Sequence, residues 1–161
     1  MKHNAALFFA PALVLCFSAC VKDEIDQTPD PPVEICGIDG MRMKADVDGA
    51  AICFSSTLVA NLADGQLTIG GINPTSGSLA LQLDETSVGT HSATGDMNQV
   101  FFTMGTVAYQ STNEAPGVIT VNSHDQGANR IKGSFTVQLA SPDGSPAKNV
   151  SGTFEVLYLE Q

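Results

Sequence analysis

The chain has 161 residues, enough for one domain, and its 17 acidic and seven basic side chains give a formal charge of −10. An acidic surface repels the phosphates of nucleic acids, so we exclude a nucleic-acid partner. The sequence contains no tryptophan and only two tyrosines, which leaves few aromatic rings that could stack on sugars.

Residues 1–19 are predicted to be a cleavable export signal. Lys2 supplies a positive charge, and residues 5–17 form an apolar run that is too short to span a bilayer. Residues 17–20, Phe-Ser-Ala-Cys, resemble the lipobox of bacterial lipoproteins, so we expect cleavage before Cys20 and lipidation of its thiol. The alternative is an ordinary secretory signal cleaved after Ala19, and Cys16 is the weaker lipidation candidate.

Residues 20–39 are predicted to form the lipidated N-terminus and a disordered tether. Residues 21–35 hold five acids and three prolines, a composition that cannot build a packed core. Lys22, Asp23 and Glu24 resemble a surface-export signal of Bacteroidota lipoproteins, in which a lysine and two acids follow the lipid-bearing cysteine. We therefore expect a protein anchored by lipid to the outer membrane, with exposure at the cell surface as the finer expectation.

Residues 40–161 are predicted to form a single all-β domain, because apolar and polar residues alternate along most of this stretch. The pattern predicts an antiparallel β-sandwich or a flattened meander barrel. Nine or ten short strands are expected, near 41–47, 50–55, 57–62, 66–72, 78–83, 88–92, 99–109 (one strand or two), 117–123, 130–140 and 149–159.

Two hairpins follow from turn dipeptides. If Asp48-Gly49 is a two-residue turn, Val47 faces Ala50 and Ala45 faces Ile52, so that apolar residues share one side. If Asp64-Gly65 is a turn, Leu62 faces Leu67 and Ala60 faces Ile69 in the same way. A shift of one residue would destroy both patterns, so turn and alternation support each other.

Alternation also predicts which aromatic side chains of the C-terminal half point into the core. Val100, Phe102 and Met104 are predicted to point inward together, and Tyr158 is expected to share the inward face with Phe154. Tyr109 is then the one tyrosine expected at the surface.

Five segments resemble an uncharacterised domain family that is common in Bacteroidota lipoproteins. They are ADVDGAAICF (45–54), GQLTIGGIN (65–73), VGTHSA (88–93), GVITVNSHDQGANRIKGSFTVQL (117–139) and NVSGTFEVLY (149–158). The resemblance implies a β-domain on a lipoprotein, and it implies no activity.

Cys36 and Cys53 are predicted to form a disulfide in an oxidising envelope, with two unpaired thiols as the alternative. Ser123-His124-Asp125 holds the residue types of a hydrolase triad, but side chains of consecutive residues diverge on an extended backbone. His91 lies far from His124 in the sequence, and no spacing typical of a zinc site is present. We expect no catalytic residues, no metal site and no cofactor.

The function expected is that of a cell-envelope lipoprotein that acts by binding or assembly without catalysis, with a protein or glycan as its partner. Recognition is assigned to loops near 73–78, 84–98, 110–117 and 140–149, because loops on a rigid scaffold are frequent binding sites. The alternative is a carrier of a small apolar ligand in a barrel lined by Phe101, Phe102, Met104 and Phe135.

Overall fold

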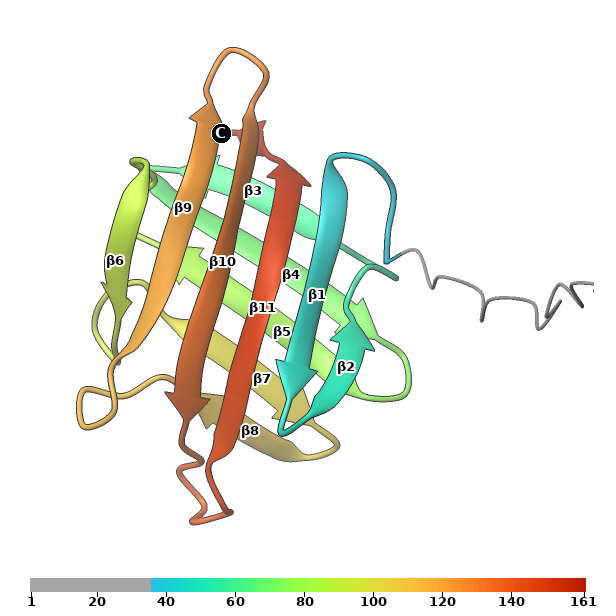
Figure 1. Ribbon diagram of the computed structural model, residues 1–161, viewed down its shortest axis with the longest axis vertical. Helices are drawn as coiled ribbons and strands as arrows, with labels where there is room; N and C mark the ends of the chain where they lie inside the picture. Colours follow the sequence, from blue (N-terminus) through green and yellow to red (C-terminus); the bar gives the residue numbers. More distant parts are fainter. Residues whose placement is uncertain (1–35) are drawn as a thin grey trace, which may run out of the picture. The chain divides into compact units, whose positions relative to one another are not determined.

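Twelve strands form two six-stranded β-sheets that pack face to face in the computed structural model, which describes residues 36–161 (Figure 1). The predicted signal peptide, the lipidation site at Cys20 and the export motif at Lys22, Asp23 and Glu24 lie outside the described residues. Within 36–161, no helix is long and apolar enough to cross a membrane. The two packed sheets confirm the predicted all-β sandwich, and the alternative of a flattened meander barrel is wrong.

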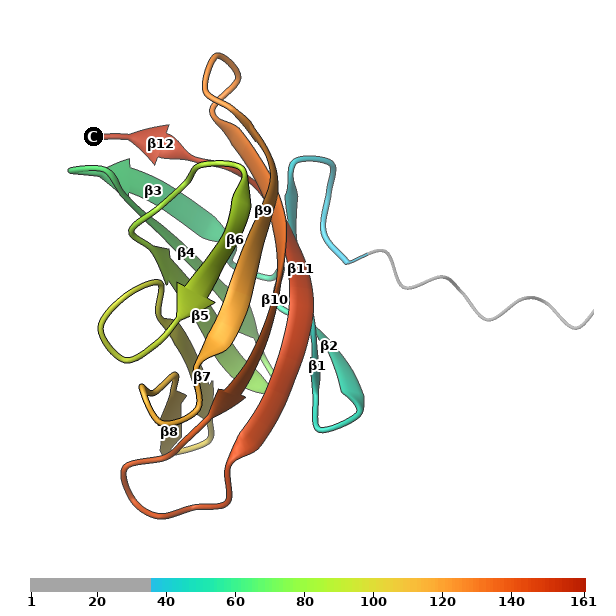
Figure 2. The ribbon, with the colours of Figure 1, turned by 60° about the vertical axis from the view of Figure 1, so that its left-hand side comes forward.

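The first sheet, sheet A, comprises in spatial order β2 (Ala50–Cys53), β1 (Met41–Val47), β11 (Lys148–Leu157), β10 (Arg130–Leu139), β9 (Gly117–Asp125) and β6 (Gly89–Ala93). The second sheet, sheet B, comprises β12 (Leu159–Glu160), β3 (Val59–Ala63), β4 (Gln66–Asn73), β5 (Gly77–Leu83), β7 (Val100–Met104) and β8 (Val107–Gln110). The strands of the two layers cross obliquely, as Figures 1 and 2 show.

The chain passes repeatedly between the two layers. It builds β1 and β2 in sheet A, β3 to β5 in sheet B, β6 in sheet A, β7 and β8 in sheet B, and β9 to β11 again in sheet A. The first strand pairs with β11 along its whole length, so segments from opposite ends of the domain are hydrogen-bonded neighbours. This pairing joins the N-terminal and C-terminal parts of the domain within sheet A.

Both predicted hairpins are confirmed in register. Val47 faces Ala50 and Ala45 faces Ile52 across the first turn. Asp48 has a φ of 51° and Gly49 a φ of 89°, the left-handed backbone that a two-residue hairpin turn requires. The Asp64-Gly65 hairpin has the same geometry, with its predicted cross-strand pairs in place.

The core lies between the inner faces of the sheets and contains the inward sets that alternation predicts, except Met104. Two cross-strand pairs on β10 and β11 combine a glycine with a phenylalanine: Gly133 faces Phe154, and Phe135 faces Gly152. Each ring lies over the opposite glycine, so a Cβ on Gly152 would stand 2.6 Å from Cζ of Phe135. Both phenylalanines are 2% exposed, and the glycines make the space for them.

The strand count exceeds the prediction for two reasons. The segment 99–109 divides at a turn into β7 and β8, and the segment 149–159 divides at Tyr158. Beyond Tyr158 the chain leaves sheet A, and β12 pairs in parallel with β3, so the sandwich is not wholly antiparallel. Met104 is 43% exposed, because it lies at the very end of β7; its predicted inward position was wrong.

Candidate binding surfaces

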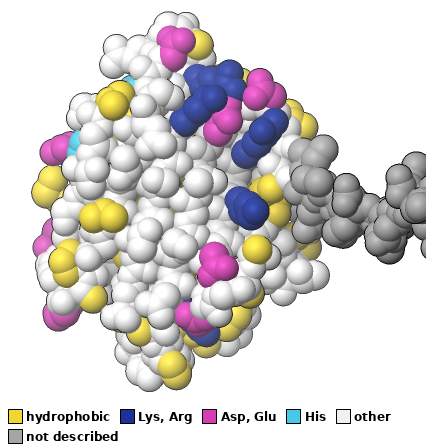
Figure 3. All heavy atoms as spheres, viewed as in Figure 1, with side chains coloured by type: hydrophobic (Ala, Val, Ile, Leu, Met, Phe, Trp, Pro, Cys, Tyr) yellow, Lys and Arg dark blue, Asp and Glu magenta, His cyan; other side chains and the backbone are white. Residues whose placement is uncertain are grey.

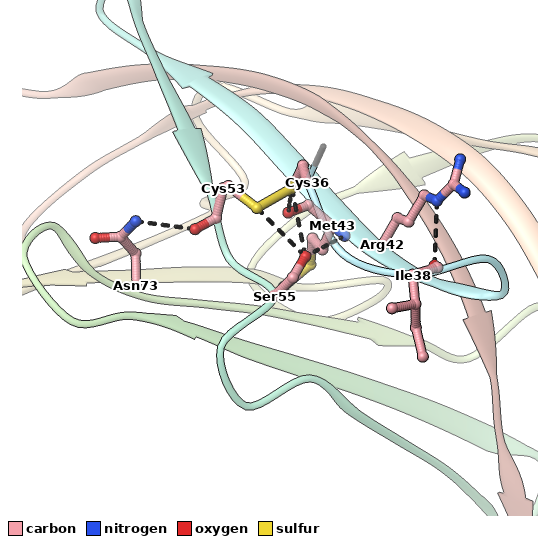
Figure 4. The surroundings of a disulfide bond; sticks show 7 residues. All are labelled: Cys36, Ile38, Arg42, Met43, Cys53, Ser55 and Asn73. Carbon is pink, nitrogen blue, oxygen red and sulfur yellow. Dashed lines mark hydrogen bonds between the residues drawn. A yellow bond between two sulfur atoms is a disulfide. The ribbon is translucent and has the colours of Figure 1, made fainter. Parts of the chain in front are cut away.

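A disulfide joins Cys36 to Cys53 at the end of β2, with their Cα atoms 5.4 Å apart (Figure 4). The Oγ of Ser55 lies 3.3 Å from one sulfur and 3.4 Å from the other. Cys53 faces Lys44 across the hairpin, on the outer side of sheet A. The bond closes a loop of 17 residues, which contributes about 3 kcal/mol in the chain-entropy model.

The same bond ties residues 36–39 to the β-domain, although the sequence assigned them to the tether. Ile38 forms an isolated bridge with Met41, and the Nε of Arg42 donates to the carbonyl of Ile38. Asp39 accepts a hydrogen bond from Arg130 of β10. Residues 36–39 are therefore in contact with the β-domain.

The Ser-His-Asp tripeptide contacts a crossover loop, Tyr158 and the following turn. The Nδ1 of His124 lies 3.0 Å from the carbonyl of Thr86, and its Nε2 lies 2.9 Å from the hydroxyl of Tyr158. Asp125 accepts a hydrogen bond from the backbone N–H of Ala128 in the following turn. Burial, the largest effect, raises the pKa of Tyr158 above its ordinary value.

His91 fixes the crossover from β5 to β6. Its Nδ1 lies 2.8 Å from a carboxylate oxygen of Glu85, and its Nε2 lies 2.8 Å from the carbonyl of Ser87. Since His124 holds Thr86, the two histidines contact three consecutive residues of this crossover. Both side chains thus hold a loop that joins the sheets, a role that the sequence did not suggest.

The predicted recognition loops are largely held by their own polar side chains. Asn73 Oδ1 accepts hydrogen bonds from the N–H groups of Thr75 and Ser76. In the loop 140–149, hydrogen bonds from Ser145 and Ser141 hold the pKa of Asp143 below its ordinary value. These hydrogen bonds join residues within each loop.

The prediction of a surface ring at Tyr109 was wrong. Tyr109 is 4% exposed, and its ring stacks on that of Phe102 with centroids 6.0 Å apart. Its position on β8 points it inward because β8 is a separate strand with its own alternation. Tyr158 is buried as expected. Neither tyrosine is therefore placed to stack on a sugar.

The four residues expected to line a carrier cavity are not brought together. Phe102 and Phe135 belong to the packed core between the sheets. Phe101 lies on the opposite side of β7, where it is only partly buried, and Met104 is at the strand end. Since the described sheets form a sandwich, these side chains do not enclose a common interior.

The outer face of sheet B differs from the rest of this acidic domain because it carries no charge over five of its strands. None of the residues in β3, β4, β5, β7 or β8 is ionisable except the inward-facing Tyr109. Glu160 of the edge strand β12 is the only acid in the described sheet. Acidic side chains elsewhere in 36–161 lie mainly in loops and turns.

Cross-strand register shows how this face is built. One row runs Val59, Gly70, Ala80 and Phe101, which are neighbours on adjacent strands. Beside it, Ile72 faces Ser78, whose hydroxyl lies 2.6 Å from that of Thr103. Val59 is 53% exposed, Ile72 45% and Leu159 of the edge strand 69%. The small residues in the middle leave a low, uncharged surface rimmed by exposed aliphatic side chains.

Among residues 36–161, no three histidine, cysteine, aspartate or glutamate side chains converge in a way that would hold a metal ion. Comparisons of the chain with protein-family models, with curated proteins and with solved structures return no match. The resemblance to Bacteroidota lipoproteins therefore stays a prediction, and the function has to be argued from the surfaces described above.

Proposed function

We propose that this chain is a lipid-anchored envelope protein that acts without catalysis, by docking a partner protein on the outer face of sheet B. The observation that carries the proposal is the uncharged outer face with its exposed Val59, Ile72 and Leu159. Large apolar side chains grouped on a surface without charge are typical of protein interfaces, whose centres are depleted in charged residues.

The charge of the domain supports this choice of surface. Elsewhere the acidic side chains would repel an acidic partner and would have to lose their hydration on contact with a neutral one. On the outer face of sheet B, Thr68, Ser78 and Gln82 can both donate and accept hydrogen bonds, so they stay satisfied when a partner covers them. We expect the partner to present an uncharged, apolar surface of its own.

The disulfide supports the proposed location in the cell envelope. Disulfides such as the one between Cys36 and Cys53 form and persist mainly in oxidising compartments outside the cytoplasm. Export through the signal at 1–19 and lipidation at Cys20 would deliver the chain to that compartment, and acyl chains would hold it at a membrane. Replacement of Cys20 by serine should abolish incorporation of labelled palmitate, whereas Cys16→Ser should leave it unchanged.

The docking surface is tested by matched charge substitutions. Ala80→Glu places a carboxylate in the centre of the outer face of sheet B, and Thr120→Glu places one on the outer face of sheet A. The lipoproteins are extracted gently from the host membrane, and the mass of each complex is measured by native mass spectrometry. We expect Ala80→Glu to lose a partner that wild type and Thr120→Glu retain. Equal retention by all three, or a bare protein mass for wild type, would contradict the proposal.

A further inference from the structure

Two shallow grooves adjoin on the outer face of sheet A, on the opposite side of the sandwich from the proposed docking face. Their volumes are about 710 and 400 Å³, and both are lined by Asp46, Thr136 and Ser151. The larger groove is bounded by the hairpin turn at Gly49 and by Pro116 of the loop before β9. Together they cross β1, β11 and β10.

The floor of the grooves is a grid of hydroxyl groups set by strand register. Thr153 of β11 faces Ser134 of β10. Ser151 faces Thr136 in the adjacent row. Strands stand about 4.8 Å apart, and residues on one face of a strand repeat about every 6.8 Å. Each hydroxyl both donates and accepts, which suits a ligand that is itself rich in hydroxyl groups.

Positive charge gathers at one end of this grid. The basic residues of 36–161 are Arg42, Lys44, Arg130, Lys132 and Lys148, and all except Lys148 lie on the outer face of sheet A. Figure 3 shows Lys and Arg side chains grouped toward the end where β10 begins. In an acidic domain, this grouping makes one end of the face attractive to a negative charge.

Four of these five cations form an ion pair with a carboxylate, and Lys44 does not. Lys132 and Arg130 both contact the carboxylate of Glu155, and Arg130 also contacts Asp39. Lys44 is exposed, lines the smaller groove and forms no ion pair within residues 36–161. Its ammonium group is therefore the cation best placed to receive a ligand carboxylate.

Acidic side chains lie where the two grooves meet and at the far end of the larger one. Asp46, which lines both grooves, accepts a hydrogen bond from the N–H of Gly49, and Asp48 pairs with Lys148 at 2.8 Å. A polymer with a charge on every unit would meet repulsion from these carboxylates, whereas neutral hydroxyl groups can donate to them. The grooves therefore suit a ligand whose acidic group is at one end.

We propose that this face binds an oligosaccharide that carries a carboxylate, with that carboxylate at Lys44 and neutral sugar hydroxyls over Ser134, Thr136 and Ser151. Because neither tyrosine of the domain is exposed, recognition depends on charge and hydrogen bonds and not on ring stacking. The binding is accordingly weak and decreases as the salt concentration rises.

The test uses the full-length lipoprotein in detergent micelles and saturation-transfer NMR at low salt. The probes are a galactose trisaccharide in which only the terminal unit is a galacturonate, and the neutral galactose trisaccharide of the same linkage. Lys44→Gln should weaken binding of the singly charged trisaccharide about fivefold, which equals about 1 kcal/mol, the upper end of the range for exposed ion pairs. It should leave binding of the neutral trisaccharide unchanged. Thr136→Val should weaken both probes, because both use its hydroxyl.

The matched control is Gln82→Glu, which changes the net charge by the same amount on the outer face of sheet B. If it weakens binding of the singly charged trisaccharide as much as Lys44→Gln does, the effect is one of net charge and the proposed site is wrong. Failure of the singly charged trisaccharide to bind, or equal binding of the two probes to wild type, would also overturn the proposal. Circular dichroism spectra of the variants check that each remains folded.

Discussion

Replacement of Gly152 by alanine tests how the sandwich is packed. A Cβ at this position would stand 2.6 Å from Cζ of Phe135 and closer still to the backbone carbonyl of Lys44, whereas ordinary contact begins at 3.4 Å. The ring could shift by the missing distance, but the carbonyl belongs to the neighbouring strand β1 and cannot rotate away. Sheet A would therefore have to open between β1 and β11.

The size of the effect follows from two opposing contributions. Overpacking of a core costs about 1–3 kcal/mol, and the backbone obstacle places Gly152→Ala at the upper end of that range. Alanine also restricts the backbone of the unfolded chain more than glycine does, which raises the free energy of unfolding by about 0.4–1 kcal/mol. We expect a net loss of about 2 kcal/mol in the free energy of unfolding, measured by urea denaturation.

Gly127→Ala is the matched control. Its Cβ would stand 3.5 Å from Oδ1 of Asp125, an ordinary contact, in the turn between β9 and β10. We expect this variant to be as stable as wild type or slightly more stable. If Gly152→Ala and Gly127→Ala unfold at the same urea concentration, the packing described between β1, β10 and β11 is wrong.

Three further predictions concern stability. Replacing Cys36 and Cys53 together by serine should lower the free energy of unfolding by about 3 kcal/mol, and wild type in reductant should match the variant. The hydrogen bond from Lys148 lowers the pKa of Asp48 below 3.8. The ionised Asp48 therefore stabilises the fold above pH 3.8, and this stabilisation is lost as the pH falls through the lowered pKa. Asp48→Asn should remove this acid-dependent loss of stability, measured by urea titrations at a series of pH values. Burial raises the pKa of Tyr158 above 10, so stability should decline as the pH rises past 10, and Tyr158→Phe should remove this decline in thermal unfolding at alkaline pH.

Sequence reasoning succeeded where a local signal and a periodic one agreed. The Asp48-Gly49 and Asp64-Gly65 dipeptides specify tight turns, and the alternation of the flanking residues allows only one register. The strand β10 was equally clear, since Ile131 to Leu139 alternate without interruption. These features depend on residues close together in the chain.

Features that depend on distant strands were not accessible. Nothing in β1 alone specifies that it pairs with β11, because many apolar strands would satisfy its inner face equally well. Tyr109 was misplaced because β7 and β8 alternate independently on either side of their turn. The division of the chain between two sheets also hid the contrast between their outer faces, which only the topology reveals.

The central claim is that the outer face of sheet B is covered by a partner protein in the envelope. It is tested most directly by placing a photo-crosslinking benzophenone amino acid at Ala80 or at Thr120 and irradiating cells that express each variant. The account predicts a discrete protein adduct from position 80 and none from position 120, with the mass of the adduct distinguishing a second copy of this chain from another protein. The absence of an adduct at position 80, or the same adduct from both positions, would contradict it.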